Sequence, residues 1–583
     1  MCGIFGVVGN DKNAPSVVLE GLKCLEYRGY DSWGVGVATN GQIKIDKHSG
    51  KIGNASLNLP EGSFAFGHTR WATHGGVTDI NAHPHLDCSG KISVVHNGII
   101  ENYQELKAQL KDHKSISETD TEVFAHLVED LRKDHDLKEA VRLGFLKLKG
   151  LSAFLVAEAD SQTLIAIKNG SPLVIGLGEK ENLVASDAHS LIPITRKIIF
   201  LEDNQLAEIT KDKVRIFDVK TGEELEPKVE EVTFKAIEAE KEDYPHFMLK
   251  EIEEEPKVLE NILLNLKEPI TKFSDNLKSH SRVYLVASGT AYFAALAGSY
   301  FFSKIADKEL VPIAGSEFSY KEKFLDKNSL VVFLSQSGET IDIIEPLKKI
   351  KEKGIKTSAL VNVFGSTLYR LVDEKIWLEA GPEIAVVSTK AMIAKLAILG
   401  LSAFTLDGKY SEGEKLLQET IDNMKDIFLT QNSLNQVVDL LFDKEHIYII
   451  GRGVSYPVAL ESALKLKEAC YIHTEGFSGG ELKHGAIALI DKGTPCIIFA
   501  PQDETFDSVI SNAMEIKARG GVIIGVSEEN NEVFDYHIQV KGSKDLTAIN
   551  NILIGQLLAY KIAVKKGLDP DKPRNLAKSV TVK

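Results

Sequence analysis

Apolar and polar residues alternate in different ways in the two parts of this chain, and the change comes near residue 218. Before it, short apolar or alternating segments such as Ser63-Phe64-Ala65-Phe66 predict strands. Residues 164–177 and 183–209 predict further strands and hairpins. Residues 14–25 and 122–130 have the apolar spacing of helices. The first part is therefore expected to consist of many short strands and few helices.

A charged segment separates this part from the second half. Residues 220–260 are dense in charge and sparse in apolar side chains, which predicts a linker. Within it, residues 244–252 predict a helix that leads into the second half.

The second half contains an internal repeat. The strand and turn that begin at Val283 return 164 residues later at Ile447, with Gly289 matching Gly453. Apolar strands followed by amphipathic helices predict a parallel sheet covered by helices in each copy. The predicted organisation is an N-terminal domain over 2–218, a linker over 219–272, α/β lobes over 273–415 and 437–573, and a C-terminal tail over 574–583.

Composition sets limits on function. A chain of 583 residues is too long for one core, and 43% apolar with 26% charged residues is ordinary for a globular protein. The net charge of −15 argues against a nucleic-acid partner. No signal-peptide pattern opens the chain, and no apolar run reaches ~18 residues, so we expect a cytoplasmic protein without a membrane partner.

The five cysteines are Cys2, Cys24, Cys88, Cys470 and Cys496. They show no metal-ligand spacing, so the sequence suggests neither a zinc site nor a disulfide framework, and no cofactor is expected.

Cys2 carries the first chemical signal. Once Met1 is removed, this residue presents a thiol and a free α-amine together. The amine, whose pKa is near ~8, can accept the thiol proton, so the residue is a nucleophile with its own base. A Met-Cys start alone is weak evidence, and the strings that follow decide its meaning.

Three later strings supply the groups that an amide-hydrolysing site needs. They are His68-Thr69-Arg70-Trp71-Ala72-Thr73-His74-Gly75, Val94-Val95-His96-Asn97-Gly98 and Ser117-Glu118-Thr119-Asp120. A glutamine substrate requires a cation, an anion and oxyanion donors, which Arg70, Asp120 and Asn97 with Gly98 could provide in that order. Singly, these residues also fit a surface ion pair, a helix cap and a hairpin turn.

Together with Cys2-Gly3-Ile4-Phe5-Gly6 and Leu25-Glu26-Tyr27-Arg28-Gly29-Tyr30-Asp31-Ser32, these strings resemble the N-terminal-nucleophile (class II) glutamine amidotransferases. The resemblance implies an Ntn-hydrolase αββα sandwich in which Cys2 attacks the glutamine amide, forms a glutamyl thioester and releases ammonia. It also implies a set of substrate residues: Arg70, Thr73, His74 and Asp120 as glutamine binders, Asn97 and Gly98 as the oxyanion hole, and Trp71 on a mobile loop over the site.

A hydroxyl-rich turn in the first lobe predicts a phosphate site. The strand at 330–334 runs into Ser335-Gln336-Ser337-Gly338-Glu339-Thr340, which opens a helix. Free N–H groups and the helix dipole both favour an anion there. Helix capping would need one hydroxyl, and this turn has three. The matching turn of the second lobe carries Asp503 and Glu504, so only the first lobe should bind phosphate.

This turn and the repeat resemble sugar isomerase (SIS) domains. The strings at Glu383–Lys390, Leu460–Glu468 and Gly479–Gly485, with the tail from Pro573 to Val582, extend the resemblance to the isomerizing glutamine–fructose-6-phosphate transaminases over essentially the full chain. That family implies two tandem SIS α/β lobes and synthesis of glucosamine 6-phosphate from fructose 6-phosphate and glutamine, the first step of amino-sugar nucleotide biosynthesis. It also implies a homodimer with a shared sugar site.

The same resemblance implies roles for single residues. Glu468 would be the base that moves a proton between the two sugar carbons, Lys578 would form an imine with the open-chain ketose, and His484 of a neighbouring subunit would open the ring. The sugar and its phosphate would contact Thr290, Ser335, Gln336, Ser337, Thr340, Val386, Ser388 and Lys465. Without the strings, Lys465 and Glu468 would read as a surface helix pair and Lys578 as part of a frayed tail.

Four positions depart from the family pattern: Ser288, Ala291, Trp33 and Ala486. Ala291 removes a hydroxyl expected near the phosphate. Two other functions stay open, namely an amidotransferase for another sugar phosphate and a non-enzymatic phosphosugar sensor. Ammonia made at Cys2 would need a dry route to the sugar, with the Trp71 loop as its gate.

Overall fold

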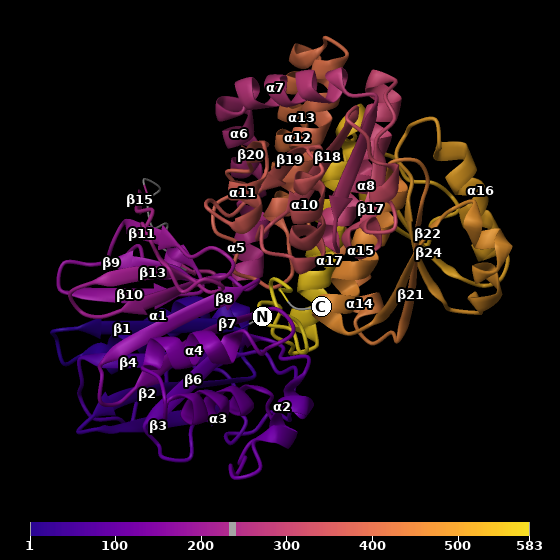
Figure 1. The fold of residues 1–583 in the computed structure, drawn as a ribbon. Helices are drawn as coiled ribbons and strands as arrows, with labels where there is room; N and C mark the ends of the chain where they lie inside the picture. Colours follow the sequence, from indigo (N-terminus) through magenta and orange to yellow (C-terminus); the bar gives the residue numbers. More distant parts are fainter. Residues whose placement is uncertain (1, 233–240, 582–583) are drawn as a thin grey trace. The chain divides into compact units, whose positions relative to one another are not determined.

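The computed structural model describes residues 2–232 and 241–581. Within it, two units are distinct: Met1–Glu238 with Ser579–Lys583, and Ala239–Lys578 (Figure 1). The strands of the first unit are β1 (Gly3–Gly9), β2 (Ser32–Thr39), β3 (Gln42–Ser49), β4 (Phe64–Arg70), β5 (His85–Leu86), β6 (Ile92–Gly98), β7 (Ser152–Glu158), β8 (Thr163–Asn169), β9 (Val174–Leu177), β10 (Glu181–Ala185), β11 (Lys197–Phe200), β12 (Gln205–Ile209), β13 (Val214–Asp218), β14 (Glu224–Leu225) and β15 (Glu230–Glu231). Its helices are α1 (Ala14–Leu25), α2 (Tyr103–Gln109), α3 (Thr121–Leu131) and α4 (Leu137–Phe145), with short 3₁₀ turns η1 (Glu26–Arg28) and η2 (Ala188–Ser190).

These strands form two antiparallel sheets, ordered β15-β11-β9-β10-β1-β4-β2-β3 and β14-β13-β12-β8-β7-β6-β5. Phe66 and Leu155 belong to the apolar core between the sheets. Ile4 joins that core, whereas Phe5 joins the core beneath α1, because successive strand residues point to opposite faces. Phe124 of α3 lies in a third core on the outer face of the seven-stranded sheet. The αββα sandwich predicted from the resemblance is confirmed.

Two five-stranded parallel sheets form the framework of the second unit. The first lobe has β16 (Arg282–Ala287), β17 (Val311–Ala314), β18 (Ser329–Ser335), β19 (Lys356–Val361) and β20 (Glu374–Trp377), and the second lobe has β21 (His446–Gly451), β22 (His473–Ser478), β23 (Pro495–Phe499), β24 (Val522–Ser527) and β25 (Tyr536–Gln539). Their orders are β17-β16-β18-β19-β20 and β22-β21-β23-β24-β25. The first strand of each lobe therefore lies between its second and third strands, so the repeat seen in the sequence has one topology.

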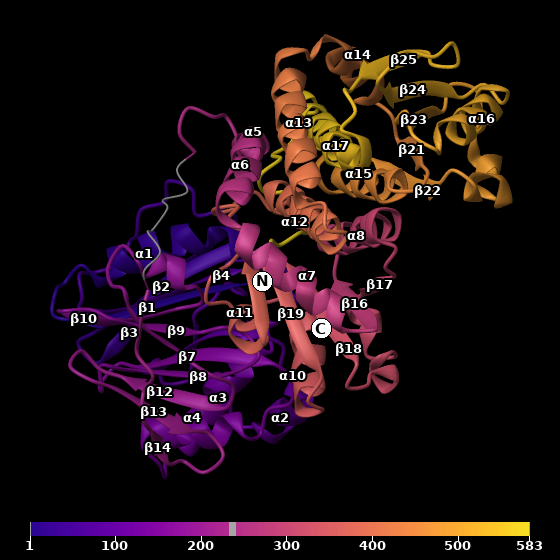
Figure 2. The ribbon, with the colours of Figure 1, turned by 90° about the horizontal axis from the view of Figure 1, so that it is seen from above.

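Helices cover both sheets. They are α5 (Phe247–Glu253), α6 (Glu255–Asn265), α7 (Lys267–Ser279), α8 (Thr290–Ala306), α9 (Gly315–Phe318), α10 (Ile341–Glu352), α11 (Thr367–Leu371), α12 (Lys390–Leu406), α13 (Tyr410–Leu429), α14 (Asn432–Leu441), α15 (Ser455–Cys470), α16 (Phe506–Lys517) and α17 (Thr547–Lys565), with 3₁₀ turns η3 (Glu322–Phe324), η4 (Glu481–His484), η5 (Ala486–Leu489) and η6 (Lys544–Leu546). Figure 2 shows α8, α12, α15 and α17 between the two sheets. Helix α12 is buried on nearly every side, which explains why its sequence is apolar all round.

Three local features differ from their sequence patterns. The predicted linker 219–272 contains α5 and α6, whose side chains Met248 and Leu259 are fully buried in the core of the second unit, while 233–240 lie outside the described residues. Asn97 and Gly98 do not form a hairpin turn, because both pair with β7 as the last residues of β6. Trp33, whose surroundings the sequence left open, is buried beside His48, with ring centroids 5.0 Å apart.

Among the described residues, one helical stretch, Lys544–Lys565, is long and apolar enough to cross a membrane. Its most apolar window is 89% buried inside the fold, as in the core helix of a globular protein.

Candidate functional site

The register of the eight-stranded sheet of the first unit brings Cys2 to the end of β4. Strand β1 pairs with β4 so that Gly3 lies opposite Thr69, and the residue before Gly3 therefore meets the residues that follow β4. The backbone N–H of Trp71 donates to Cys2 Sγ at 3.3 Å. Burial raises the pKa of the Cys2 thiol, so attack on an amide requires a base close to the sulfur.

Asn97 presents its amide group to the same place. Its Nδ2 donates to the Cys2 carbonyl oxygen at 3.1 Å and to Ser186 Oγ at 2.9 Å. His68 Nε2 lies 3.0 Å from Asn97 Oδ1 and 2.9 Å from the His96 carbonyl oxygen. Because burial lowers the pKa of His68 to about 3, the ring is neutral near pH 7 and carries its proton on Nε2, where two acceptors face it. This proton fixes which end of the Asn97 amide faces Cys2.

Arg70 closes the loop that follows β4. Its buried guanidinium donates to the carbonyl oxygens of Gly75 at 3.2 Å and Gly76 at 3.1 Å, and to that of His74. Asp31 Oδ2 accepts from the Ala72 N–H at 2.8 Å and fixes the start of the same loop. Thr73 is exposed on this loop.

The remaining glutamine candidates lie around this loop. The His74 ring meets the ring of Tyr103 edge to face, with centroids 5.5 Å apart. Asp120 is buried at the N-cap of α3 and accepts from the Ile100 N–H at 2.7 Å. That bond places Asp120 beside the segment that directly follows Gly98.

In the second unit, Lys465 is the centre of a buried polar cluster. Its side chain is fully buried on α15, and Nζ donates to Glu468 Oε2 at 2.8 Å and to Thr290 Oγ1 at 2.9 Å. Glu461 Oε1 lies 3.2 Å from the same nitrogen. Burial alone would lower the pKa of Lys465, but the two carboxylates raise it to about 12. The i, i+3 pair is therefore not a surface pair.

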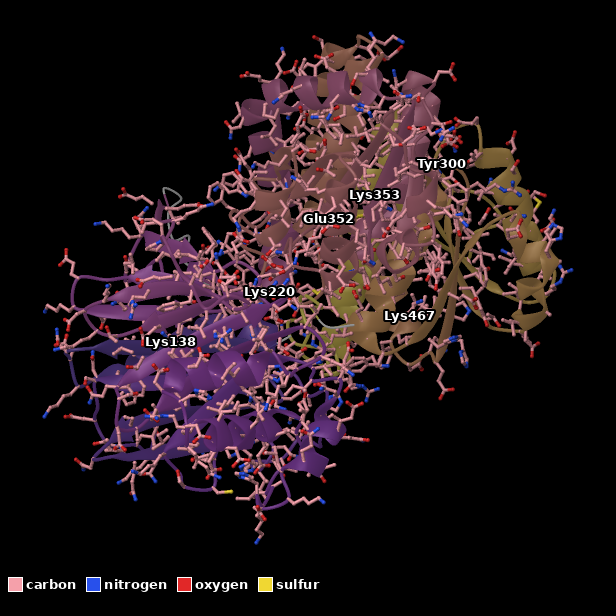
Figure 3. The ribbon with its side chains drawn as sticks, viewed as in Figure 1. Lys138, Lys220, Tyr300, Glu352, Lys353 and Lys467 are labelled. Carbon is pink, nitrogen blue, oxygen red and sulfur yellow. The ribbon has the colours of Figure 1, made fainter. Side chains whose placement is uncertain are left out.

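Neighbouring lysines of α15 have opposite surroundings. Lys465 points into the fold, whereas Lys467, labelled in Figure 3, is exposed. Two helix positions turn a side chain by about 200°, which puts the two lysines on opposite faces.

Lys578 from the C-terminal tail is equally well enclosed. Its Nζ donates to Glu383 Oε2 at 2.6 Å and to the Ala385 carbonyl oxygen at 2.7 Å, and both charged side chains are buried. Burial would raise the pKa of Glu383, but Lys578 and the bonds it accepts, among them one from Ala391 N–H, hold that pKa at about 2. The tail is thus ordered at this residue.

Ser388 joins the two ion pairs. Its carbonyl oxygen accepts from Lys465 Nζ at 3.3 Å, and its hydroxyl donates to Glu383 Oε2 at 3.0 Å. Val386 lies between Glu383 and Ser388 in the sequence, and its N–H donates to the Asp571 carbonyl oxygen at 2.9 Å. The structure therefore gathers Lys465, Glu468, Lys578 and Ser388 into one cluster from three distant segments.

The hydroxyl-rich turn lies at the start of a helix of the first lobe. It joins β18 to α10, and Thr340 is the N-cap residue of that helix. The Gly338 N–H donates to Ser335 Oγ at 2.9 Å and the Glu339 N–H to Ser337 Oγ at 3.2 Å. The Gln336 carbonyl oxygen accepts from Asn362 N–H at 3.3 Å. All four residues of this turn that the sequence predicts to contact the phosphate, Ser335, Gln336, Ser337 and Thr340, lie on it.

Comparisons with known proteins identify the domains and the family of this chain. The glutamine amidotransferase domain matches residues 68–193, and the SIS domain matches residues 276–404 and 440–546. The chain is 43% identical over 602 residues to the glutamine--fructose-6-phosphate aminotransferase [isomerizing] of Thermococcus kodakarensis, with 100% of both chains covered. The chain belongs to this aminotransferase family. The enzyme of the same name from Pyrococcus horikoshii is 42% identical over 598 residues, again with 100% of both chains covered.

Solved structures of relatives match the second half of this aminotransferase family member. The C-terminal domain of glucosamine-fructose-6-phosphate aminotransferase from Francisella tularensis is 33% identical, with a TM-score of 0.52, and covers 57% of this chain and 100% of its own. The tagatose-6-phosphate ketose/aldose isomerase of Escherichia coli has the same fold, with a TM-score of 0.51, 16% identity, and coverage of 56% of this chain and 96% of its own.

His484 stands apart from the other candidates of this aminotransferase. It lies exposed in η4 of the second lobe. The other sugar-site candidates that the structure gathers are buried or half-buried.

Several residues of the site were not singled out from the sequence. Glu383 and Glu461 stand inside strings that had been recognised, yet only the structure shows that they neutralise Lys578 and Lys465. His68 opens the string that holds Arg70, and its role depends on the partner strand β6. Glu251, on a helix predicted as part of a linker, accepts from the Ala385 N–H at 3.1 Å. A charged residue of this kind in a long charged segment gives no sequence signal.

Proposed function

We propose that this chain makes D-glucosamine 6-phosphate from D-fructose 6-phosphate and L-glutamine, as the names of its full-length relatives indicate. The observation that carries the proposal is the cluster around Ser388. It places a carboxylate on α15, a buried lysine on the same helix and the tail lysine Lys578 within one hydrogen-bonded group. An amine and a carboxylate held together are what an imine-forming isomerisation needs.

In the glutaminase half, Cys2 is the proposed nucleophile. Its thiolate adds to the carboxamide carbon of glutamine, the Asn97 amide and the Gly98 N–H stabilise the oxyanion, and ammonia leaves as the glutamyl thioester forms. Water then hydrolyses the thioester to glutamate. The α-amine freed by removal of Met1 is the proposed base, and the raised pKa of the buried thiol supports the need for one. Arg70, Thr73, His74, Trp71 and Asp120 are the proposed glutamine-binding residues.

In the sugar half, the turn at 335–340 with Thr290 is proposed to hold the phosphate, and Val386 and Ser388 to line the sugar. Lys578 Nζ, once it has lost its proton, attacks C2 of the open-chain ketone, the carbonyl oxygen leaves as water, and an imine forms. Glu383, its partner at 2.6 Å, holds the lysine in place. Ammonia then replaces the lysine at C2. Glu468 moves a proton from C1 to C2 to give the aldose, and Lys465 keeps its charge beside that carboxylate.

We further propose a cytoplasmic homodimer in which His484 serves the sugar site of a neighbouring chain. Its exposed position on η4 supports a role outside its own chain's buried cluster. Ammonia transfer from Cys2 to the sugar is proposed to follow a dry route, with Trp71 as a gate.

A single assay tests this function. Purified chain, shown by mass to begin at Cys2, is incubated with glutamine and fructose 6-phosphate, and glutamate and glucosamine 6-phosphate are both quantified. Equal amounts of the two products are expected. Cys2→Ala should abolish both with glutamine as donor, whereas Cys24→Ala, an exposed cysteine of the same unit, should leave both unchanged.

Other outcomes point to the alternative functions. Glutamate without aminosugar would indicate a different acceptor, which a panel of ketose phosphates would identify. If neither product forms and phosphosugars still bind, the chain is a sensor and the enzymatic proposal is wrong.

A further inference from the structure

A cluster of metal-binding side chains lies in the first unit, on the opposite end of α3 from Asp120. It consists of Cys88, which follows β5, His113 in the loop between α2 and α3, and His126 with Glu129 on α3. One ligand atom from each residue lies within 4.8 Å of the other three. None of these residues belongs to the proposed glutamine site.

The distances between these atoms match a tetrahedral site. Cys88 Sγ lies 3.5 Å from His113 Nδ1 and 3.6 Å from His126 Nδ1. Glu129 Oε2 lies 3.0 Å and 3.4 Å from the same two nitrogens. Zinc bonds of ~2.3 Å to sulfur and ~2.0–2.1 Å to nitrogen or oxygen put tetrahedral ligands about 3.3–3.6 Å apart. Three of these four distances already lie in that range, and the fourth, between Glu129 and His113, would lengthen slightly around an ion.

The outer nitrogens of both histidines face carboxylates. His113 Nε2 lies 3.1 Å from Asp130 Oδ1, and His126 Nε2 lies 3.7 Å from Glu122 Oε1. Histidines that bind a metal commonly donate their other N–H to a carboxylate, which fixes the ring and strengthens the ligand. His113 has that form, whereas His126 Nε2 faces the Glu122 carboxylate from beyond hydrogen-bond distance.

The same contacts limit the explanations without a metal. A neutral His113 that donates from Nε2 to Asp130 turns a lone pair from Nδ1 toward the Glu129 carboxylate, 3.0 Å away. Two acceptors at that distance repel each other unless a proton or a cation lies between them. Protonation of both rings would satisfy the carboxylates, but it does not explain why the Cys88 thiol meets both Nδ1 atoms.

An entry path is also present, and the positive charge along it is opposed by the carboxylates of the cluster. A surface pocket lined in part by His113 and His126 gives an ion access to the cluster. Lys107, Lys111 and Lys114 line the same pocket, so the carboxylates have to offset their charge. Glu129 also accepts from the Cys88 N–H at 3.0 Å, which fixes the backbone on which the thiol is mounted.

We propose that Cys88, His113, His126 and Glu129 bind a divalent transition metal of the zinc class. A thiolate, two imidazoles and one carboxylate suit zinc better than the hard cations magnesium or calcium. With four protein ligands the site is structural, and it fastens the loop between α2 and α3 to α3. The spacing of these four ligands does not reveal the site, because they come from three separate segments and only His126 and Glu129 have a regular helical spacing.

Metal content and spectroscopy test the proposal without reference to activity. The full chain, carrying Cys2→Ala so that the nucleophile cannot bind metal, is purified without chelators and analysed by inductively coupled plasma mass spectrometry. We expect close to one zinc per chain. After the metal is removed, titration with Co²⁺ should produce a thiolate-to-cobalt charge-transfer band and tetrahedral d–d bands.

Three further variants separate the site from other binding. Cys88→Ser should lose the charge-transfer band and weaken Co²⁺ binding by at least ~100-fold, because loss of an outer partner alone costs about 10–100-fold. Asp130→Asn should keep the band and weaken binding by about 10-fold. Cys24→Ser should match the parent.

Equal Co²⁺ binding by the parent and by Cys88→Ser would overturn the proposal. So would a parent that retains no zinc and shows no charge-transfer band, and the cluster would then be a network of protonated histidines and carboxylates. Because Cys88 is exposed and serine is similar in size, the variant should fold, and circular dichroism of each variant checks this.

Discussion

At the scale of single residues, the direction of a hydrogen bond decides what Asn97 can do. An amide side chain has a donor end and an acceptor end of the same shape, and only the donor end stabilises an oxyanion. His68 occupies the acceptor end at 3.0 Å, so the donor end faces Cys2. The buried neutral ring of His68 thus fixes the orientation of the Asn97 amide.

Substitutions of Asn97 and of His68 should lower glutaminase activity for different reasons. Asn97→Ala should lower kcat for glutamine hydrolysis by about 10²–10³-fold with little change in KM, because it removes the proposed oxyanion donor. His68→Leu should lower kcat by up to about 10²-fold through misorientation of the amide. His68→Gln, which can still donate to Asn97, should recover most of the loss. If His68→Leu and His68→Gln were equally impaired, the orienting role would be excluded.

Lys465 and Lys467 make a matched pair on one helix. Lys465→Ala leaves Glu461 and Glu468 without their cation, and breaking such a buried pair costs about 3–5 kcal/mol. We expect a clear fall in the melting temperature of the second unit and loss of aminosugar synthesis, while basal glutaminase activity persists. Lys467→Ala, on the exposed face, should change neither. Scanning calorimetry and the two product assays measure these effects, and equal melting temperatures would contradict the buried pair.

These residues also show what sequence can reveal. The strings around Cys2, Arg70 and Lys578 indicated the type of chemistry, because several ordered matches are hard to obtain by chance. The counter-ions Glu383 and Glu461 were not assigned, because a carboxylate partner is chosen by three-dimensional distance and not by spacing along the chain. Asn97-Gly98 was open to a hairpin interpretation, because the pairing of β6 with β7 is a long-range contact.

At the scale of elements, α5 shows how a charged segment can be part of a core. Its sequence is rich in charge, yet Met248 and Ile252 are fully buried, and Glu251 points inward to the loop that carries Glu383. Burial and the nearby Glu383 together raise the pKa of Glu251 to about 8, although Lys578 and Lys390 oppose the shift. The folded state therefore binds a proton that the unfolded state has released.

The raised pKa of Glu251 predicts how the stability of the fold depends on pH. Because the folded pKa of Glu251 is raised to about 8 from its ordinary value of about 4.5, its contribution favours the folded state at low pH and is lost as pH rises from about 4.5 to about 8. Glu251→Gln keeps an acceptor for the Ala385 N–H and removes the titration. The fall in melting temperature from about pH 5 to about pH 8 should therefore be smaller in the variant than in the wild type. Calorimetry of both proteins in matched buffers at these two pH values measures it. An unchanged pH profile would show that Glu251 does not titrate in this range.

The turn before α10 depends on one glycine. Gly338 has φ of +67°, and a Cβ there would lie 2.0 Å from Ser366 Oγ, so alanine must displace the turn. Gly338→Ala should raise the KM for fructose 6-phosphate by more than ~10-fold and spare glutaminase activity, since about 1.4 kcal/mol of lost binding already gives that factor. Gly354→Ala is the control, because Gly354 has φ of +69° with open space around it. If both variants kept a normal KM, the turn would not hold the phosphate.

At the scale of the whole molecule, the two lobes share a topology but not their chemistry. At the offset of the repeat, Lys465 and Glu468 of α15 correspond to Phe301 and Lys304 of α8. The hydroxyl-rich turn of the first lobe likewise corresponds to an acidic turn in the second. In the proposed function, one lobe would supply the phosphate-binding turn and the other the acid–base pair, and a single lobe of either kind would lack half of the site.

The proposed sharing of His484 between chains can be tested by mixing. Glu468→Gln and His484→Ala chains should each be inactive in aminosugar synthesis. Co-expressed in equal amounts, they should recover about a quarter of wild-type activity, because half of the dimers are mixed and one site in each is complete. Glutaminase activity of each chain serves as the control for folding. Mixed preparations without any recovery would place His484 and Glu468 of one site on the same chain.

The ends of the chain have a practical consequence for anyone who handles this protein. In the proposed mechanism Cys2 needs a free α-amine as its base, so an affinity tag fused before Cys2 should abolish glutamine hydrolysis. Thr581 is buried, with its hydroxyl 3.4 Å from that of Ser171, so a tag fused behind it would pull on a packed segment. A purification handle belongs instead at an exposed hairpin tip such as Asn40-Gly41, between β2 and β3.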